Sequence, residues 1–320
     1  MSNAVIKTFI LLLCFGLLGV SVPANAGRIE NIRARGYFGC GLGPDVAGFS
    51  VKQDQNNAGF DADVCRAVAV AILGADAKVV FKAAENVRQL SDNDDIDMVT
   101  RRLTWSLSRA TTHGMMFGPI TFYDGQGFLL PRDGAMSAAQ LMGEKICVNA
   151  GPHAKTLIDH FRGAVRTVIV ATDADAEKAL HDGRCTAFSA DVSWLAAARA
   201  GFKDGFARFA ILPDIISKEP LAPLVRQGDD RFYEVVRWTV IALIEAEERN
   251  VTSRNAAEFG DSHGAVLGLD ARWIEAVIAA VGNYGEMFER NLGQSSPIKL
   301  DRGLNKLWRD GGLMFAPPVR

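Results

Sequence analysis

Short apolar segments alternate with longer segments of helical periodicity along most of the chain. A continuous apolar run of four to eight residues is typical of a strand that is buried on both faces. Alternation of such strands with amphipathic helices predicts an α/β fold in which helices cover the sheets. The strands predicted in this way are 37–42, 79–82, 96–100, 145–149, 167–171 and 186–189.

Several predicted helices have recognisable ends and faces. Asp61 is expected to cap a helix that follows the first strand, and Gly74 is expected to end it. A longer helix around 232–249 has one apolar and one charged face, which is typical of packing against a core. We expect a last helix over 272–281 and an extended tail over 308–320 that packs back on the body.

The N-terminal segment has the organisation of a secretory signal peptide. Lys7 precedes an apolar run over 9–20, and Ala24 and Ala26 form an A-x-A cleavage site. The run is shorter than the roughly 17 to 25 residues of a transmembrane helix. We therefore expect a signal peptide over 1–26, cleavage after Ala26, and no membrane anchor.

Length and charge narrow the class of protein. A chain of 320 residues predicts about two domains. The formal net charge is -2 and there is no block of Lys or Arg, so nucleic acid is not an expected partner. The loop 131–134 and the prolines Pro213, Pro220 and Pro223 are weak cues for two crossings between domains.

Four cysteines follow the predicted cleavage site: Cys40, Cys65, Cys147 and Cys185. An exported protein permits disulfides, and four cysteines allow three pairings. Pairing Cys40 with Cys65 and Cys147 with Cys185 is attractive because each pair stays within one region of the chain. None of the four forms a C-x-x-C pair or lies at ligand spacing from a histidine, so no metal site is expected.

The segment 97–109 carries the most informative chemistry, because a predicted strand runs into a loop rich in hydroxyls and arginines. An arginine fork beside hydroxyl donors suits a carboxylate, although a solvated polar loop is the alternative. There is no G-x-S-x-G, P-loop or H-E-x-x-H motif, and the glycines of 39–43 lack the spacing of a phosphate cradle. The sequence therefore predicts neither an enzyme nor a cofactor.

Further stretches carry a resemblance to one family. Together they resemble the periplasmic amino-acid-binding proteins of polar amino-acid ABC importers, extracellular solute-binding protein family 3, and within it the general L-amino-acid-binding proteins. The stretches are 59–68 (GFDADVCRAV), 104–109 (TWSLSR), 123–128 (YDGQGF), 216–221 (ISKEPL), 226–230 (RQGDD), 281–286 (VGNYGE) and 311–320 (GGLMFAPPVR).

The resemblance implies a two-lobed periplasmic-binding-protein-like type II fold with two strand crossings at the hinge. Lobe 1 would comprise 27–128 and 216–320, and lobe 2 would comprise 129–215. The implied function is capture of an L-amino acid in the interlobe cleft, in the periplasm, and delivery to an inner-membrane ABC permease. The implied state is a monomer that closes around its ligand.

The resemblance also implies site residues. Arg109 would clamp the α-carboxylate, helped by Thr104 and the backbone around Arg102, and Asp191 would receive the α-ammonium group. Paired charges of this kind make it tolerable to remove a zwitterion from water. Phe49 occupies the family's aromatic position on the first loop, and core packing explains it equally well.

One departure concerns the loop after the first strand of lobe 2, where the family usually has Gly-Thr-Thr and this chain has Gly151-Pro152-His153. Proline has no N–H to donate, so one family contact is lost there. His153 would act as a donor or charge near the carboxylate, or else as a surface histidine. The ligand is then an L-amino acid, with an acidic amino acid or another carboxylate as alternatives.

Two other functions remain open at this point. A sensory or degenerate paralogue would keep the fold and change or lose the ligand, as the Pro152-His153 substitution allows. A periplasmic cyclohexadienyl-type dehydratase would use the same fold, but it needs a general acid in the cleft. The binding motifs offer no acidic residue for that role beyond Asp191.

Overall fold

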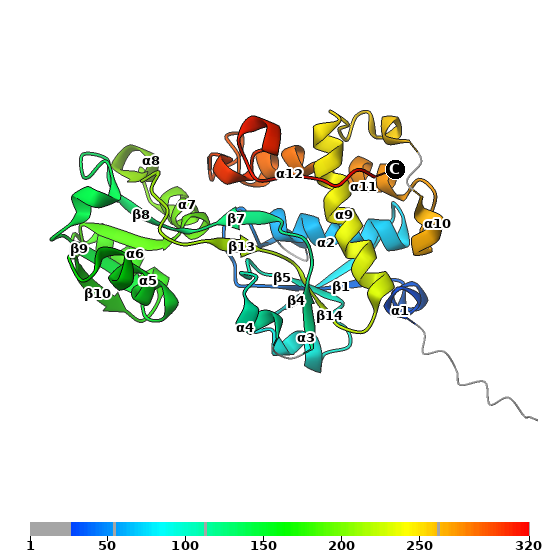
Figure 1. Ribbon diagram of the computed structural model, residues 1–320, viewed down its shortest axis with the longest axis horizontal. Helices are drawn as coiled ribbons and strands as arrows, with labels where there is room; N and C mark the ends of the chain where they lie inside the picture. The colour runs from blue at the N-terminus through cyan, green and yellow to red at the C-terminus, as the bar shows by residue number, and fades with distance from the viewer. Residues whose placement is uncertain (1–26, 54–55, 112–113, 261–262, 320) are drawn as a thin grey trace, which may run out of the picture.

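The computed structural model describes residues 27–53, 56–111, 114–260 and 263–319. The predicted signal peptide and its cleavage site lie outside these residues. Two lobes stand side by side, joined by a pair of neighbouring strands (Figure 1). Within the described ranges, no helix has the length and apolar character needed to cross a membrane.

Lobe 1 is built on a five-stranded sheet in the order β4-β1-β5-β14-β6. β1 is parallel to β4 and β5, whereas β14 is antiparallel to β5 and β6. Every residue of β1 is buried, as expected for a parallel strand covered on both faces. The strands are β1 (Phe38–Leu42), β4 (Val79–Ala83), β5 (Met98–Thr100), β6 (Met115–Phe117) and β14 (Leu224–Arg226). β2 (Val51–Gln53) and β3 (Asn56–Ala58) form a separate antiparallel pair.

The helices of lobe 1 come from both ends of the described chain, so its core unites segments far apart in sequence. α2 packs against both α9 and α11. The long amphipathic helix expected around 232–249 is α9, and its apolar face is buried. The helices are α1 (Arg28–Arg35), α2 (Phe60–Leu73), α3 (Arg88–Asp92), α4 (Leu107–Ala110), α9 (Asp230–Glu248), α10 (Gly264–Leu267), α11 (Trp273–Val281) and α12 (Tyr284–Asn291), with single 3-10 turns η2 (Ala256–Phe259), η3 (Gly303–Asn305) and η4 (Trp308–Asp310).

The expectation that Asp61 caps α2 is wrong. The cap position is Gly59, whose φ of 121° is one that residues with a side chain rarely adopt. Asp61 lies in the first turn and is buried. Gly74 ends the helix as predicted. The reason for the difference is that the carboxyl group of Asp61 turns toward the arginine loop after β5, as its interactions with Arg102 show.

Lobe 2 is built on a second five-stranded sheet in the order β10-β9-β11-β8-β12, in which β9, β10 and β11 are parallel. Side chains alternate along β9: Ile146 and Val148 pack with α5, whereas Cys147 packs with α6 and α7. This period of two places helices on both faces of the sheet. The elements are β8 (Gln126–Pro131), β9 (Lys145–Asn149), β10 (Arg166–Val170), β11 (Ala187–Asp191), β12 (Phe209–Ile211), α5 (Pro152–Phe161), α6 (Asp173–His181), α7 (Val192–Gly201), α8 (Gly205–Arg208) and the 3-10 turn η1 (Ala138–Leu141).

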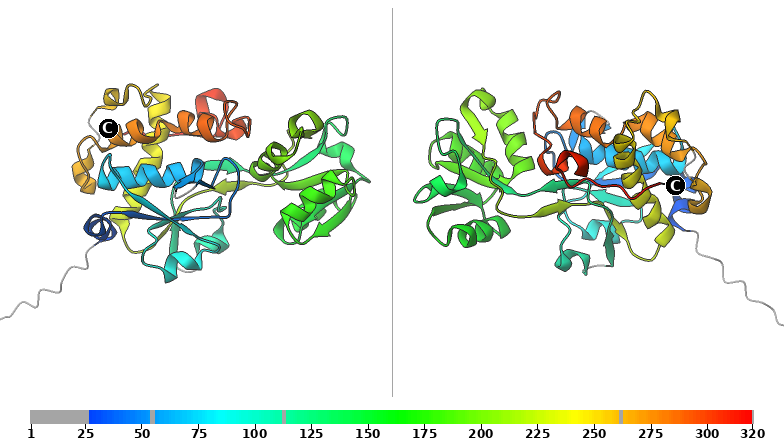
Figure 2. Two further views of the ribbon diagram at one scale, coloured as in Figure 1. Left: turned by 180° about the vertical axis from the view of Figure 1, so that it is seen from behind. Right: turned by 45° about the horizontal axis from the view of Figure 1, so that its top comes forward.

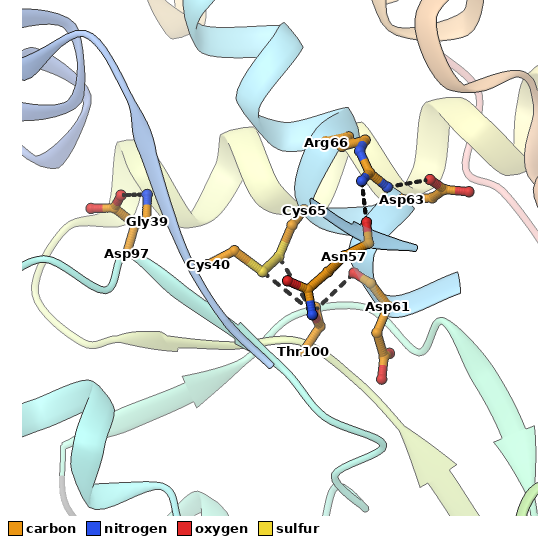
Figure 3. The surroundings of a disulfide bond; sticks show 9 residues. All are labelled: Gly39, Cys40, Asn57, Asp61, Asp63, Cys65, Arg66, Asp97 and Thr100. Atoms are coloured by element: carbon orange, nitrogen blue, oxygen red, sulfur yellow. Dashed lines mark hydrogen bonds and ion pairs between the residues drawn. A yellow bond between two sulfur atoms is a disulfide. The ribbon is translucent and has the colours of Figure 1, made fainter. Parts of the chain in front are cut away.

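Each lobe has one disulfide, and the two pairings favoured by the sequence are confirmed. Cys40–Cys65 joins β1 to α2, and Cys147–Cys185 joins β9 to the segment before β11. Figure 3 shows the first bridge with Thr100 beside both sulfur atoms. The Thr100 hydroxyl also donates to the carbonyl of Asp61 at 3.0 Å, so β5 is tied to the start of α2.

The chain passes between the two sheets along β7 (Phe122–Asp124) and β13 (Glu219–Leu221), which form a separate antiparallel pair, and Leu221 also bridges to Thr104. Figure 2 shows the same pair between the lobes in both further views. Asn305 forms two hydrogen bonds to this hinge: its side chain accepts from the N–H of Tyr123 at 2.7 Å and donates to the Tyr123 carbonyl at 3.0 Å. The C-terminal segment is therefore attached to the hinge as well as to lobe 1.

Candidate functional site

A cleft of about 480 Å³ lies between the lobes, and residues of both lobes line it. Its walls are formed where parallel strands end, namely β1 and β5 in lobe 1 and β9, β10 and β11 in lobe 2. Ligands of open α/β sheets bind at such carboxyl ends of strands. The lining residues are Pro44, Arg101, Arg102, Leu103 and Arg109 from lobe 1, and Asn149, His153, Thr172, Asp173, Ala174, Asp191 and Trp194 from lobe 2.

Arg102 reaches from lobe 1 to lobe 2. Its backbone is left-handed, with φ of 52°, and its N–H donates to the carboxyl group of Asp61. The guanidinium carbon lies 5.7 Å from the ring centre of Phe49 and 5.5 Å from that of Trp194. A weak hydrogen bond of 3.4 Å joins Arg102 Nη1 to Ser193 Oγ. Arg102 is therefore held between an aromatic ring of each lobe.

Arg109 lies on α4, is exposed and lines the cleft. Its Nη1 donates to the carbonyl of Thr104 at 3.0 Å, so one guanidinium nitrogen is anchored to its own loop. The Thr104 hydroxyl donates to Glu219 Oε2 of β13 at 2.6 Å. The loop that carries both residues is thus tied to the hinge.

Asp191 and His153 face each other on the wall of lobe 2. Asp191 ends β11 and precedes α7, and its Oδ1 lies 3.0 Å from His153 Nε2. Burial lowers the pKa of His153, but the hydrogen bond to Asp191 and its charge outweigh burial and raise that pKa above the usual value. His153 is half-buried in the cleft, so it is not a surface histidine.

Pro152 does not disrupt this wall. It occupies the first turn of α5, directly after the cap residue Gly151. The first helical N–H groups have no partner within a helix, so proline at this position costs no intrahelical hydrogen bond. It does remove the N–H that the family pattern places there, and His153 follows with its ring on Asp191.

Phe49 is buried in lobe 1 and does not line the cleft. Its ring packs edge-on against Phe60 and Phe122. The sequence left core packing and an aromatic ligand contact equally open. The structure places the ring in the core, directly beneath the guanidinium of Arg102.

Sequence reasoning missed Arg101, Asn149, Asp173 and Trp194 among the lining residues. A usable signal existed for two of them. Asn149 is the last residue of a predicted strand, and Asp173 begins the helix that follows the next strand. Polar residues directly after neighbouring parallel strands gather at one edge of the sheet.

Buried carboxyl groups lie behind both walls. Burial raises the pKa of Asp61 to about 7, against the opposing charges of Arg102 and Arg101. Burial and the charge of Asp191 raise the pKa of Asp124 on β7 to about 7. Asp124 Oδ1 accepts from the N–H of Gly125 at 2.9 Å and of Ser193 at 3.2 Å. The hinge is therefore hydrogen-bonded to the start of α7.

Known proteins resemble this chain over nearly its full length, although no protein-family model matches it. It is 40% identical to the general L-amino acid-binding periplasmic protein AapJ of Rhizobium johnstonii, over 93% of this chain and 94% of AapJ. It is 38% identical to the glutamate/glutamine/aspartate/asparagine-binding protein BztA of Rhodobacter capsulatus, over 94% of this chain and 96% of BztA.

A solved structure agrees with these relatives. The ABC transporter periplasmic binding protein of Brucella ovis, solved with glutathione bound, is 39% identical to this chain. The match has a TM-score of 0.82 and covers 92% of this chain and 100% of that one. Close relatives are thus binding proteins of ABC transporters and not enzymes. The chain belongs to the family of periplasmic amino-acid-binding proteins of ABC transporters.

Proposed function

We propose that this protein captures an L-amino acid between its two lobes in the periplasm and delivers it to an inner-membrane ABC permease. One observation carries the proposal: guanidinium groups of lobe 1 face carboxyl groups of lobe 2 across a single cleft. A zwitterionic ligand carries one charge for each wall. Binding both charges therefore draws the lobes together, and closure is favoured by the ligand's affinity for the closed state.

The roles of the site residues follow from this arrangement. Arg109 binds the α-carboxylate, with Thr104 holding its loop on the hinge strand β13. Asp191 receives the α-ammonium, and His153 orients its carboxylate through Oδ1. Arg102 contributes positive charge between the lobes, supported by Phe49 from below.

The remaining parts of the proposal concern the molecule as a whole. Residues 1–26 act as a signal peptide cleaved after Ala26. Lobe 1 comprises 27–125 and 216–320 and lobe 2 comprises 126–215, three residues earlier than the expected start at 129, because β8 begins at Gln126 and pairs within the sheet of lobe 2. β7 and β13 form the hinge. The protein acts as a monomer and binds no nucleic acid, in keeping with its net charge of -2.

A thermal-shift screen tests the function. The mature protein is freed of co-purified ligand and heated with each of the twenty L-amino acids and with small carboxylates and amines. A ligand present at a thousandfold excess over Kd stabilises the folded state by about 4 kcal/mol. A clear shift with an amino acid is expected. The absence of a thermal shift with all twenty amino acids would contradict the proposal and favour a paralogue whose site is changed by Pro152 and His153.

A further inference from the structure

Two neighbouring side chains on the wall of lobe 2 present oxygen atoms that lack a donor. Asp173 receives a hydrogen bond from the side chain of Asn149, which leaves each residue with one further oxygen. Those oxygens, Asp173 Oδ1 and Asn149 Oδ1, are buried and have no hydrogen-bond partner among the described residues. Both residues line the cleft.

Such a pair of acceptors is costly unless a ligand satisfies it. A buried acceptor without a donor destabilises a protein, because it has given up its hydrogen bonds to water and gained none in return. Burial also raises the pKa of Asp173, and Asp191 raises it further, while His153 and Arg102 act in the opposite direction. A second carboxylate placed beside Asp173 would add repulsion, whereas an N–H group would remove the cost.

The sheet order indicates the order of magnitude of the distance between this acceptor pair and Asp191. The strands run β10-β9-β11, and Asp173, Asn149 and Asp191 stand at or just beyond their carboxyl ends in that order. Neighbouring strands are about 4.8 Å apart, so Asp173 and Asp191 are separated by on the order of 10 Å. The two acceptor positions therefore suit a ligand with nitrogen donors at both ends of a short chain.

Resting on the proposed function, we propose that Asp173 and Asn149 are specificity-determining residues that bind an uncharged side-chain amide, so that the cleft prefers L-glutamine to L-glutamate. Five bonds separate the α-nitrogen of glutamine from its amide nitrogen, a reach of about 6 Å when extended. Two hydrogen bonds of about 2.9 Å complete the span from Asp191 to Asp173.

The positive charges of lobe 1 do not reverse this preference. Arg109 is assigned to the α-carboxylate. Arg101 acts on the buried carboxyl group of Asp61, and Arg102 acts on both Asp61 and Asp173, so carboxyl groups of the protein already oppose these two charges. A ligand side chain that reaches toward α6 meets the acceptors of lobe 2, where a glutamate carboxylate has no hydrogen to donate.

Calorimetric titration of the mature protein with L-glutamine and L-glutamate tests the assignment. A site built to hydrogen-bond a donor rejects an analogue that lacks it, so we expect glutamine to bind at least about a hundredfold more tightly. Asp173→Asn should reduce that ratio at least about tenfold, mainly by tightening glutamate, because the repelling charge is removed. Asp159→Asn is the control, since it removes an exposed carboxylate of the same lobe and should leave the ratio unchanged.

Other outcomes overturn the assignment in distinguishable ways. Equal affinity for the two ligands in the wild type contradicts it while leaving amino-acid binding intact. An equal loss for both ligands in Asp173→Asn would mean that Asp173 pairs with Arg102 across the closed cleft instead. If neither ligand binds but another amino acid does, the specificity assignment fails alone; if none of the twenty binds, the proposed function fails with it.

Discussion

The two walls of the cleft use opposite means of carrying charge. The wall of lobe 1 presents three arginines on one continuous segment, a loop that runs into α4, and buried Asp61 lies behind them. The wall of lobe 2 collects Asn149, His153, Asp173 and Asp191 from separate strand ends. A continuous loop fixes neighbouring charges by short-range backbone geometry, whereas the second wall exists only because three parallel strands end at one edge. The groups of lobe 1 that can bind a carboxylate therefore lie in one sequence motif. The groups of lobe 2 that line the cleft are brought together only by the fold.

The largest expected effect comes from removing one charge from either wall. Arg109→Ala and Asp191→Ala should each weaken binding of the amino acid found in the screen about a thousandfold, because truncating one partner of a hydrogen-bonded charge pair leaves the other unpaired. Calorimetric titration measures the loss. Arg237→Ala, on the exposed face of α9, is the control for lobe 1. Affinity within tenfold of the wild type in either variant would remove that residue from the site.

Removing the disulfide of one lobe should lower the free energy of unfolding by nearly as much as the charge removals lower the free energy of binding. Ligand specificity should not change. The bridges close loops of 25 and 38 residues in sequence separation. Loop entropy then predicts losses of about 3.5 kcal/mol for the Cys40→Ala, Cys65→Ala double variant and about 4 kcal/mol for Cys147→Ala, Cys185→Ala. Urea unfolding measures both. A loss under about 1 kcal/mol would show that the lobe does not depend on its bridge.

Asp61→Asn tests the role of the buried carboxyl group that lies behind the arginines of lobe 1. The pKa of Asp61 is raised from 3.8 to about 7 in the folded state, so the folded state binds its proton more tightly than the unfolded chain. The contribution of this group to the free energy of unfolding is fully present at low pH. It falls by about 3 kcal/mol as pH rises from about 4 to 7. The variant lacks this dependence, because an amide does not titrate.

Unfolding of Asp61→Asn and the wild type should therefore be compared at pH 4 and at pH 7. The variant should gain on the wild type as pH rises, while its amide oxygen still accepts from the Arg102 N–H. A stability difference that is the same at both pH values would contradict a buried, protonated Asp61.

His153→Gln gives the smallest expected effect and probes the wall of lobe 2. The pKa of His153 is raised in the folded state, so its pairing with Asp191 stabilises the protein fully below about pH 6.5, the value in the unfolded chain. That stabilisation, on the order of 1 kcal/mol, is lost as pH rises through the folded pKa. Thermal unfolding between pH 5.5 and 8.5 should show the wild type losing its advantage over the variant. A constant difference would mean that the ring stays neutral throughout.

The sequence by itself predicted the alternation of strands and helices and favoured the cysteine pairing, because periodicity reports which side chains a segment buries. The loop around Arg109 also carries its chemistry within a few residues, whereas Asp191 was implied by the family resemblance alone; both stay proposed site residues. The ends of the predicted strands also held the signal for Asn149 and Asp173, but the meaning of that signal depended on which strands are neighbours.

Only the tertiary structure decided the second wall of the cleft and the place of three side chains. Phe49 lies in the core beneath Arg102, Asp61 turns to the arginine loop instead of capping α2, and His153 lies on Asp191. The sequence pattern indicates which side chains of a segment are buried. The residues that those side chains contact are set by strand order and long-range packing. Residues more than a hundred positions apart, such as Thr104 and Glu219, come together only when the sheets and the hinge have formed.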